Sequence, residues 1–281
     1  MKIFLSTLIL LLSVGTAQAS APSRINNIVI VHGAFADGSG WEGVYQILKD
    51  KKYNVTIVQN PLVSLEADAT ATQEAITKQN GPVILVGHSY GGMVITQAGN
   101  NPNVKALVYV AAFVPDLGES LASLSDTLGK LNLQPAITSA PIGPAYPDDP
   151  KNPENNSQFL LVNPKKFPAF FAADVKRLNP KKAQFMADSQ APLAGKAYTD
   201  VITPDPKNPN EKVAWMNKPS YYIIAGNDHM IAPVDENWMA KRAGIAQIKI
   251  KTVKGSSHAV YLSHPDDVAD VIEKAAKAAY K

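Results

Sequence analysis

The sequence predicts a doubly wound α/β fold, with helices covering both faces of a mostly parallel sheet. Three observations support this prediction. Short, fully apolar runs, typical of strands buried on both faces, occur in both halves of the chain. Helical patterns alternate with these runs, as in α/β folds. A stretch rich in Pro and Asn, at about residues 116–217, separates the two halves and predicts an insertion into a single domain.

The first half of the chain alternates between candidate strands and candidate helices. Strands are expected at 28–31, 55–58, 83–86 and 106–110, with helices at 41–49, 64–79 and 93–98. Ser64 is suited to cap the second of these helices. Connections between parallel strands are right-handed almost without exception, so this alternation predicts layered crossover units.

The stretch from Asp116 to Asn217 contains helical segments between the Pro/Asn-rich runs 144–153 and 204–210. The aromatic residues of these segments are Phe167, Phe170, Phe171 and Phe185. Because an aqueous loop has no need of clustered aromatics, we expect a lid over the edge of the sheet, with a plain surface excursion as the alternative.

The strand pattern resumes after this stretch. Strands are expected at 221–225 and 248–253, and an amphipathic helix that starts near Pro265 closes the chain.

The first nineteen residues have the features of a secretory signal peptide. Lys2 provides a positive charge, an apolar run covers 8–14, and the pattern Ala17-Gln18-Ala19 predicts cleavage after Ala19. The apolar run is short for spanning ~30 Å of hydrocarbon, so we expect no stable membrane anchor. The mature α/β domain would comprise residues 20–281 and be exported to the periplasm or the medium.

Composition narrows the range of functions. The chain has 281 residues with 27 basic and 24 acidic side chains, a formal charge of +3. So small an excess gives no reason to expect nucleic acid or an anionic membrane as a partner. The chain contains no cysteine, which excludes disulfides, a cysteine nucleophile and thiolate metal sites.

The motif GHSYGG at 87–92 is the strongest chemical signal. It places Ser89 in a G-x-S-x-G sequence directly after a predicted strand and directly before a predicted helix. Glycines two positions either side allow the tight turn that lifts a nucleophilic serine above the sheet. A chance serine in a glycine-rich turn is the alternative, and the strand-turn-helix context disfavours it.

A nucleophilic serine needs a base and an acid. The histidines of the chain are His32, His88, His229, His258 and His264. His258 is the best candidate for the base, because it lies in a loop just after the last strand. The acid is Asp228, which directly follows the strand at 221–225, or Asp116, which follows the strand at 106–110. The order Ser, Asp, His favours Asp228.

Acyl transfer also requires two backbone N–H groups that stabilise an oxyanion. Tyr90, directly after the nucleophile, should provide one of them. The loop after the first strand should provide the other, and Ala34 is the candidate because Gly33 allows its backbone to approach the serine. An ordinary turn at the end of a strand is the alternative for this loop.

These motifs resemble the α/β-hydrolases, in particular small esterases related to plant methylsalicylate esterases and hydroxynitrile lyases. The resemblance rests on VHGAFADGSGW (31–41), GHSYGG (87–92), YVAAFVPDLGES (109–120), AGNDHMIAP (225–233), MAKRAG (239–244) and SSHAVYLSHP (256–265). It implies Ser89, Asp228 and His258 as a triad, and Ala34 with Tyr90 as the oxyanion hole. In this superfamily the acid sometimes follows the earlier strand, where Asp116 stands.

We therefore expect a serine hydrolase that cleaves a small carboxylic ester through an acyl-enzyme, without a metal or organic cofactor. Hydroxynitrile-lyase-like or perhydrolase activity at the same site is an alternative, and so is a non-catalytic protein that binds a small ligand. A lyase of this type needs a positive group to hold cyanide, and the sequence indicates none. A binding protein is disfavoured because every catalytic position is filled.

Overall fold

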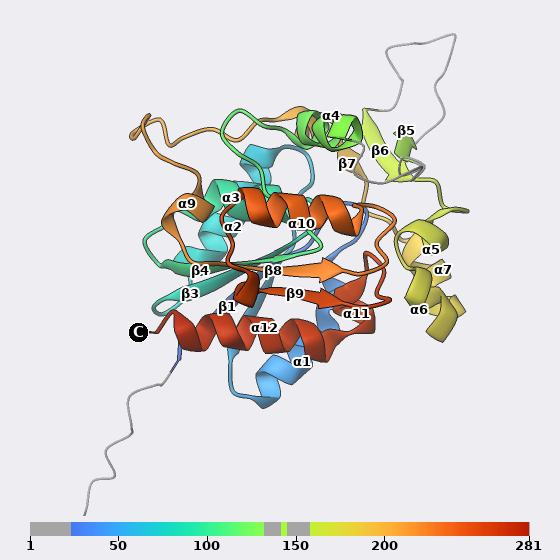
Figure 1. Ribbon diagram of the computed structural model, residues 1–281, viewed down its shortest axis with the longest axis horizontal. Helices are drawn as coiled ribbons and strands as arrows, with labels where there is room; N and C mark the ends of the chain where they lie inside the picture. The colour runs from blue at the N-terminus through green and yellow to red at the C-terminus, as the bar shows by residue number, and fades with distance from the viewer. Residues whose placement is uncertain (1–23, 132–141, 145–157, 281) are drawn as a thin grey trace, which may run out of the picture.

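The computed structural model describes residues 24–131, 142–144 and 158–280 (Figure 1). The expected signal peptide at 1–19 and most of the first Pro/Asn-rich run lie outside these residues. Within the described ranges, none of the helices has the length and apolar character required to cross a membrane.

The predicted strands form one sheet in which every neighbouring pair is parallel, which confirms the α/β class. The strand order is β2-β1-β3-β4-β8-β9. The strands are β1 (Asn27–Val31), β2 (Asn54–Val58), β3 (Val83–His88), β4 (Val104–Val110), β8 (Ser220–Ala225) and β9 (Ile250–Val253). Because all strands run the same way, the loops after β1, β3, β8 and β9 meet at one edge.

The start of the last strand differs from the sequence prediction. A 3-10 turn, Gln247–Lys249, precedes β9, so the strand begins at Ile250 rather than at residue 248. Ile248 is 93% exposed, because its position in the turn directs the side chain away from the sheet. The apolar pattern 248–253 therefore extended the strand two residues too far.

Helices pack on both faces of the sheet (Figure 1). The helices α1 (Glu42–Asp50) and α12 (Pro265–Ala278) contact each other on one face. The helices α2 (Leu65–Thr77), α3 (Gly91–Ala98) and α10 (Pro233–Arg242) lie on the other. Ser64 caps α2 as predicted, because its side chain accepts a hydrogen bond from the Ala67 N–H at 3.1 Å.

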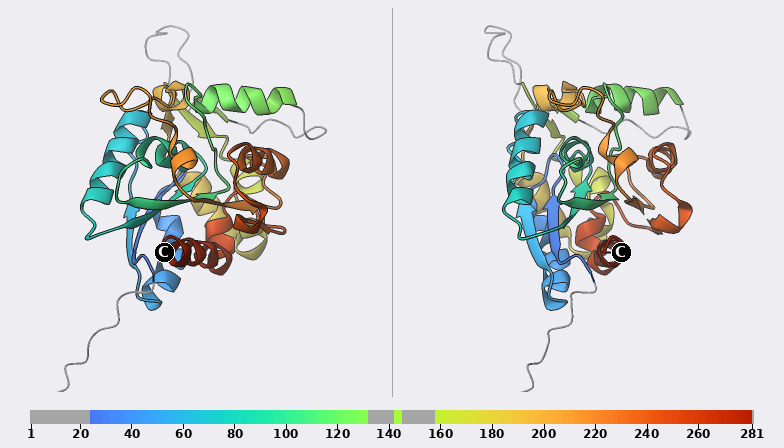
Figure 2. Two further views of the ribbon diagram at one scale, coloured as in Figure 1. Left: turned by 60° about the vertical axis from the view of Figure 1, so that its left-hand side comes forward. Right: turned by 90° about the vertical axis from the view of Figure 1, so that its left-hand side faces the viewer.

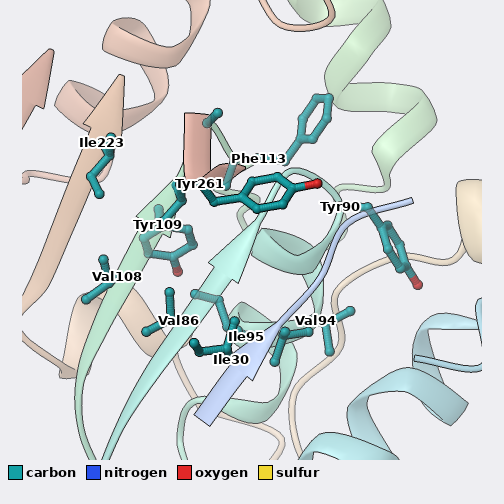
Figure 3. Close-up of a cluster of buried hydrophobic side chains, with 14 of the residues drawn as sticks. Ile30, Val86, Tyr90, Val94, Ile95, Val108, Tyr109, Phe113, Ile223 and Tyr261 are labelled. Carbon is teal, nitrogen blue, oxygen red and sulfur yellow. The ribbon is translucent and has the colours of Figure 1, made fainter. Parts of the chain in front are cut away.

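The core lies between the central strands and these helices (Figure 3). Side chains from four neighbouring strands, Ile30, Val86, Val108 and Ile223, are fully buried. Ile95 of α3 packs against them from one face and is also fully buried. Branched apolar residues pack well at such positions, which is why the strand runs were recognisable in the sequence.

Among the described residues, the chain between β4 and β8, which we call the insertion, contributes helices and short strands outside the main sheet. Its helices are α4 (Leu121–Leu131), α5 (Phe167–Phe170), α6 (Ala173–Leu178), α7 (Pro180–Asp188), α8 (Gly195–Thr199) and α9 (Ala214–Asn217). A small antiparallel sheet, β5-β6-β7, joins Ile142–Pro144, Phe159–Val162 and Leu193–Ala194. All views place α4 on the side of the molecule opposite α1 and α12 (Figure 2).

The aromatic residues of the insertion divide into two groups. Phe167 and Phe171 are fully buried, and their rings stack at 4.6 Å between centroids. Phe185 is 58% exposed. The helices that carry these residues lie beside the ends of β8 and β9 (Figure 1). The insertion thus covers part of the edge where the strands end, while its action as a movable lid stays a prediction.

Candidate active site

Ser89 lies in the turn between β3 and α3. Its backbone φ is 51°, a value that residues other than glycine rarely adopt. Neighbouring glycines make this turn possible. A Cβ on Gly87 would lie 2.5 Å from the Gly91 carbonyl oxygen, and one on Gly91 would lie 2.5 Å from that of Val31. The sequence therefore folds here into a strained, closely packed turn, which is the arrangement expected of a nucleophile elbow.

The structure brings Ser89, His258 and Asp228 together in one hydrogen-bonded chain. His258 Nδ1 lies 2.6 Å from Asp228 Oδ2, and His258 Nε2 lies 2.8 Å from Ser89 Oγ. Because a carboxylate only accepts, Nδ1–H donates to Asp228, and Nε2 is left to accept from the serine hydroxyl. The three residues are at most 8% exposed. This chain can move a proton from Ser89 to His258 while Asp228 stabilises the imidazolium.

The loops after β8 and β9 hold Asp228 and His258 in register. The Gly226 N–H donates to the Val253 carbonyl at 2.9 Å, and the Asn227 N–H donates to the Ser256 carbonyl at 2.8 Å. These bonds continue the pairing of the two strands beyond their ends. The Asp228 side chain is therefore fixed by its own loop and by the loop that carries its partner.

Asp116, the alternative candidate for the acid, is not hydrogen-bonded to His258. Its carboxylate accepts from the Leu117 N–H at 2.8 Å, and its own N–H donates to Glu119 Oε2 at 2.8 Å. Short polar side chains commonly close turns in this way. Asp116 thus organises the turn that leads into the insertion.

Two residues that the sequence analysis did not assign to the active site pack against His258. The ring of His88 lies 4.6 Å from the His258 ring, and its Nε2–H donates to the His258 carbonyl at 3.0 Å. Phe171 meets the same ring edge-on, with centroids 4.7 Å apart and planes at 84°. His88 directly precedes Ser89, so its place beside the site could have been inferred, whereas nothing in the sequence linked Phe171 to His258.

His88 supports His258 without adding a charge. Burial, and then the neighbouring His258, lower the pKa of His88 well below its ordinary value. A neutral His88 donates its hydrogen bond and exerts no charge repulsion on an imidazolium at His258.

His32, His229 and His264 have structural partners. His32 Nδ1–H donates to the Gly33 carbonyl at 2.8 Å, and its Nε2 accepts from the Asn60 N–H at 2.9 Å. Burial lowers the pKa of His32. His229 contacts the Ala169 carbonyl, and His264 lies at the start of α12, as expected.

The predicted oxyanion loop lies against the serine turn. A Cβ on Gly33 would lie 2.7 Å from Ser89 Cβ, so only glycine permits this approach. In the part of the chain that the structure describes, neither Ala34 nor Tyr90 uses its backbone N–H in a hydrogen bond to another backbone group. Gly33, directly before Ala34, thus lies against Ser89, and Tyr90 directly follows Ser89 in the chain. That the N–H groups of Ala34 and Tyr90 bind an oxyanion stays a prediction.

The side chain of Tyr90 is anchored away from the nucleophile. Its hydroxyl donates to Asp68 Oδ2 at 2.7 Å, and Asp68 Oδ1 accepts from the Leu62 N–H at 2.7 Å. Burial raises the pKa of Asp68, although the two hydrogen bonds oppose this shift. No pattern in the sequence indicated this anchor, which fixes the backbone of the residue directly after Ser89.

The insertion is bonded to this edge at several points. The Phe35 N–H donates to the Ala191 carbonyl at 3.1 Å, and the Ala259 N–H donates to the Phe171 carbonyl at 3.0 Å. The hydroxyl of Ser257 donates to Asp174 of α6. The insertion thus contacts both the loop after β1, which contains Ala34, and the loop after β9, which contains His258.

Comparisons with known proteins agree with this fold. Residues 28–271 match the model of the alpha/beta hydrolase family. The alpha/beta hydrolase nvfD of Aspergillus novofumigatus is 27% identical over 89% of this chain and 96% of its own length. The carbendazim hydrolyzing esterase of a Nocardioides species is 33% identical over 35% of this chain and 46% of its own. The crystal structure of polyneuridine aldehyde esterase, 18% identical, superposes with a TM-score of 0.69 over 88% of this chain and 98% of that one.

Proposed function

The chain belongs to the alpha/beta hydrolase family, and from that premise we propose that it is a serine esterase acting on small carboxylic esters. The family predicted from the sequence motifs is confirmed by the match over residues 28–271. The observation that carries the proposal is the buried chain from Ser89 through His258 to Asp228. The carbendazim hydrolyzing esterase, similar over part of the chain, also supports ester cleavage.

The geometry supports a reaction in two stages. Ser89 Oγ attacks the ester carbonyl carbon while His258 Nε2 takes the hydroxyl proton. The tetrahedral oxyanion receives hydrogen bonds from the N–H groups of Ala34 and Tyr90. Collapse of this intermediate expels the alcohol, which takes the proton from His258, and leaves an ester on Ser89.

Water completes the cycle. His258 removes a proton from a water molecule as it attacks the acyl-enzyme, and then returns that proton to Ser89 Oγ as the acid leaves. Asp228 stays ionised throughout and stabilises the imidazolium in each stage. Every step uses side chains and backbone groups of this chain, with substrate and water.

The test of the proposal is Ser89→Ala. The variant should keep its fold by circular dichroism and lose about 10⁶-fold in kcat, as serine hydrolases without their nucleophile do. A fluorophosphonate probe should label the wild-type protein at Ser89 and leave the variant unlabelled. A panel of aryl and alkyl esters of graded chain length serves as substrate. Ester hydrolysis that persists in the variant would refute the assignment of Ser89.

We also propose that the protein is exported and that residues 1–19 are removed. The charged start, the short apolar run and the Ala17-Gln18-Ala19 pattern support this proposal. Protein purified from its native host should have an intact mass that begins at Ser20. A full-length mass in the cytoplasmic fraction would contradict it.

A further inference from the structure

Glu236 is a buried carboxyl group behind the acid of the proposed triad. It lies in the first turn of α10 and is 0% exposed. Its Oε2 accepts a hydrogen bond from the Ala225 N–H at 3.0 Å, at the end of β8. Acidic residues are common in the first turn of a helix, but they usually remain in contact with water. A carboxyl group without solvent needs a partner or a proton.

The acidic neighbour of Glu236 is Asp228 itself, because both residues bond to Ala225: Glu236 accepts from its N–H, and the Asp228 N–H donates to its carbonyl at 3.2 Å. The oxygens of Asp228 already accept from several donors. Oδ1 accepts from the Met230 and Ile231 N–H groups at 2.6 and 3.0 Å, and Oδ2 accepts from His258. Among the described residues, Oε1 of Glu236 has no hydrogen-bond partner that could donate to it. Two carboxyl groups therefore share a dry site with fewer donors than two anions require.

The hydrogen bonds decide which of the two carries the charge. Asp228 accepts two backbone N–H groups and the His258 N–H, all of which favour the anion. Glu236 accepts only the Ala225 N–H. Two adjacent buried carboxylates repel each other, so one proton must remain in the pair. That proton belongs on Glu236, whose Oε1 is otherwise unused.

We infer that Glu236 is a positioning residue, which keeps its proton at neutral pH and donates it as an Oε1–H hydrogen bond to the carboxylate of Asp228. The bond would hold Asp228 against His258 Nδ1. It would also leave a single negative charge to stabilise the imidazolium. Its importance for turnover rests on the proposed esterase function, whereas the protonation of Glu236 does not.

The surroundings of Glu236 agree with this inference. Burial, followed by the charge of Asp228, raises the pKa of Glu236 well above its ordinary value. Asp235 on the same turn contributes in the same direction. Tyr222 of β8 also faces the group, but its hydroxyl donates to the Ala112 carbonyl and accepts from the Ala112 N–H at 3.0 Å. Tyr222 is therefore engaged elsewhere.

Infrared spectroscopy tests the proton directly. The spectrum of the wild type minus that of Glu236→Gln, at neutral pH, should contain the carbonyl stretching band of a protonated carboxyl group. Glutamine has nearly the same shape, its carbonyl can accept from Ala225, and its NH₂ can donate to Asp228. The variant should therefore fold. A difference spectrum with only carboxylate bands would overturn the inference.

Kinetics test the positioning. Glu236→Gln should retain most of the esterase activity because it retains a donor. Glu236→Met, which removes the donor, should lower kcat by about 10- to 100-fold, by analogy with the loss of partners that orient metal-binding side chains. KM should stay within about twofold, since the substrate does not touch this residue. The matched control is Asp235→Asn, which removes a charge from the same turn and should leave kcat unchanged.

The two proposals fail in different ways. If the wild type hydrolyses no ester and Ser89 takes no fluorophosphonate label, the esterase proposal fails while the infrared band still reports on Glu236. If the wild type is active but Glu236→Gln loses as much kcat as Glu236→Met, the residue acts only through packing or charge, and the positioning role is wrong.

Discussion

The strands that carry Ser89, Asp228 and His258 differ from the insertion beside them in how their residues are fixed. Every residue of β3 and β8 is buried, whereas β9 is only partly buried. The loops after β8 and β9 are bonded to each other. Apart from α4, the helices of the insertion have four to nine residues, and two of them expose Leu178 and Phe185 by 67% and 58%. The hydrogen bonds at the edge and the buried pair Phe167 and Phe171 attach them to the strands.

This difference suggests a division of labour. The sheet sets the distances on which proton transfer depends, and it tolerates little change because interiors are closely packed. The insertion covers the edge and shapes the surroundings of the site, so most of its residues should be replaceable. Pairs of matched substitutions can test whether the division holds.

The largest difference is expected between two aspartates. Asp228→Asn should lower kcat by about 10⁴-fold, because the amide no longer selects the correct tautomer of His258. Asp116→Asn, at the start of the insertion, should keep activity within about twofold, since its side chain only closes a turn. Steady-state kinetics on the two purified variants measure both effects. A dead Asp116→Asn beside an active Asp228→Asn would assign the acid to the earlier loop.

The next pair tests whether the insertion contains residues that belong functionally to the sheet edge. Phe171→Ala should lower the free energy of unfolding by about 3–5 kcal/mol, because it empties a fully buried site. It should also lower kcat, since the ring packs against His258. Phe185→Ala, at an exposed position, should change stability by no more than about 0.5 kcal/mol. Urea denaturation and steady-state kinetics on the two variants measure these effects. If both variants lose the same stability and activity, burial does not separate the roles of the two aromatic residues.

The sequence was informative where burial and chain direction act locally. Apolar runs predicted the strands, and glycines predicted the turn at Ser89. Because parallel strands end at one edge of a sheet, the sequence also indicated that Asp228 lies near His258. It was uninformative where a role depends on contacts across the fold. The β5-β6-β7 sheet has strands of only two to four residues, too short for a periodic pattern. Phe171 and Glu236 acquire their roles only through neighbours distant in sequence.

Two glycines allow the backbone packing of the sheet edge to be compared with that of the insertion. A Cβ on Gly92, next to the serine turn, would lie 2.0 Å from the Phe113 carbonyl oxygen. Gly92→Ala should therefore cost about 3 kcal/mol of unfolding free energy, the upper part of the range for overpacking. A Cβ on Gly129 of α4 would meet nothing within 4 Å. Gly129→Ala should stabilise by up to about 1 kcal/mol, because alanine favours a helix. Thermal and urea unfolding measure both; a stable Gly92→Ala would show that the sheet edge can relax.

The smallest expected effect lies at an ion pair that joins the two regions. Glu119, at the start of the insertion, accepts from Arg242 of α10 at 2.6 Å (Nη1 to Oε1) and 2.8 Å (Nη2 to Oε2). Burial acts to raise the pKa of Glu119, but the hydrogen bonds from Arg242 and from the Asp116 N–H outweigh it and lower the pKa. The folded chain thus holds the carboxylate at a lower pH than the unfolded chain does.

The sign of the pH dependence follows from this shift. A carboxyl whose pKa is lowered by folding stabilises the protein above its unfolded pKa, near 4.5, and the stabilisation disappears as the pH falls through the folded pKa. Glu119→Gln should therefore cost about 1–2 kcal/mol at pH 7, in the range of hydrogen bonds to charged groups at partly exposed sites. This loss of unfolding free energy should become smaller when urea titrations are repeated at steps below about pH 4.

The control is Glu74→Gln, which removes the exposed ion pair between Glu74 of α2 and Lys78. It should lower the unfolding free energy by less than about 0.5 kcal/mol at any of these pH values. If Glu119→Gln costs the same in acid as at neutrality, its contribution comes from packing, and the insertion is not held to α10 by charge.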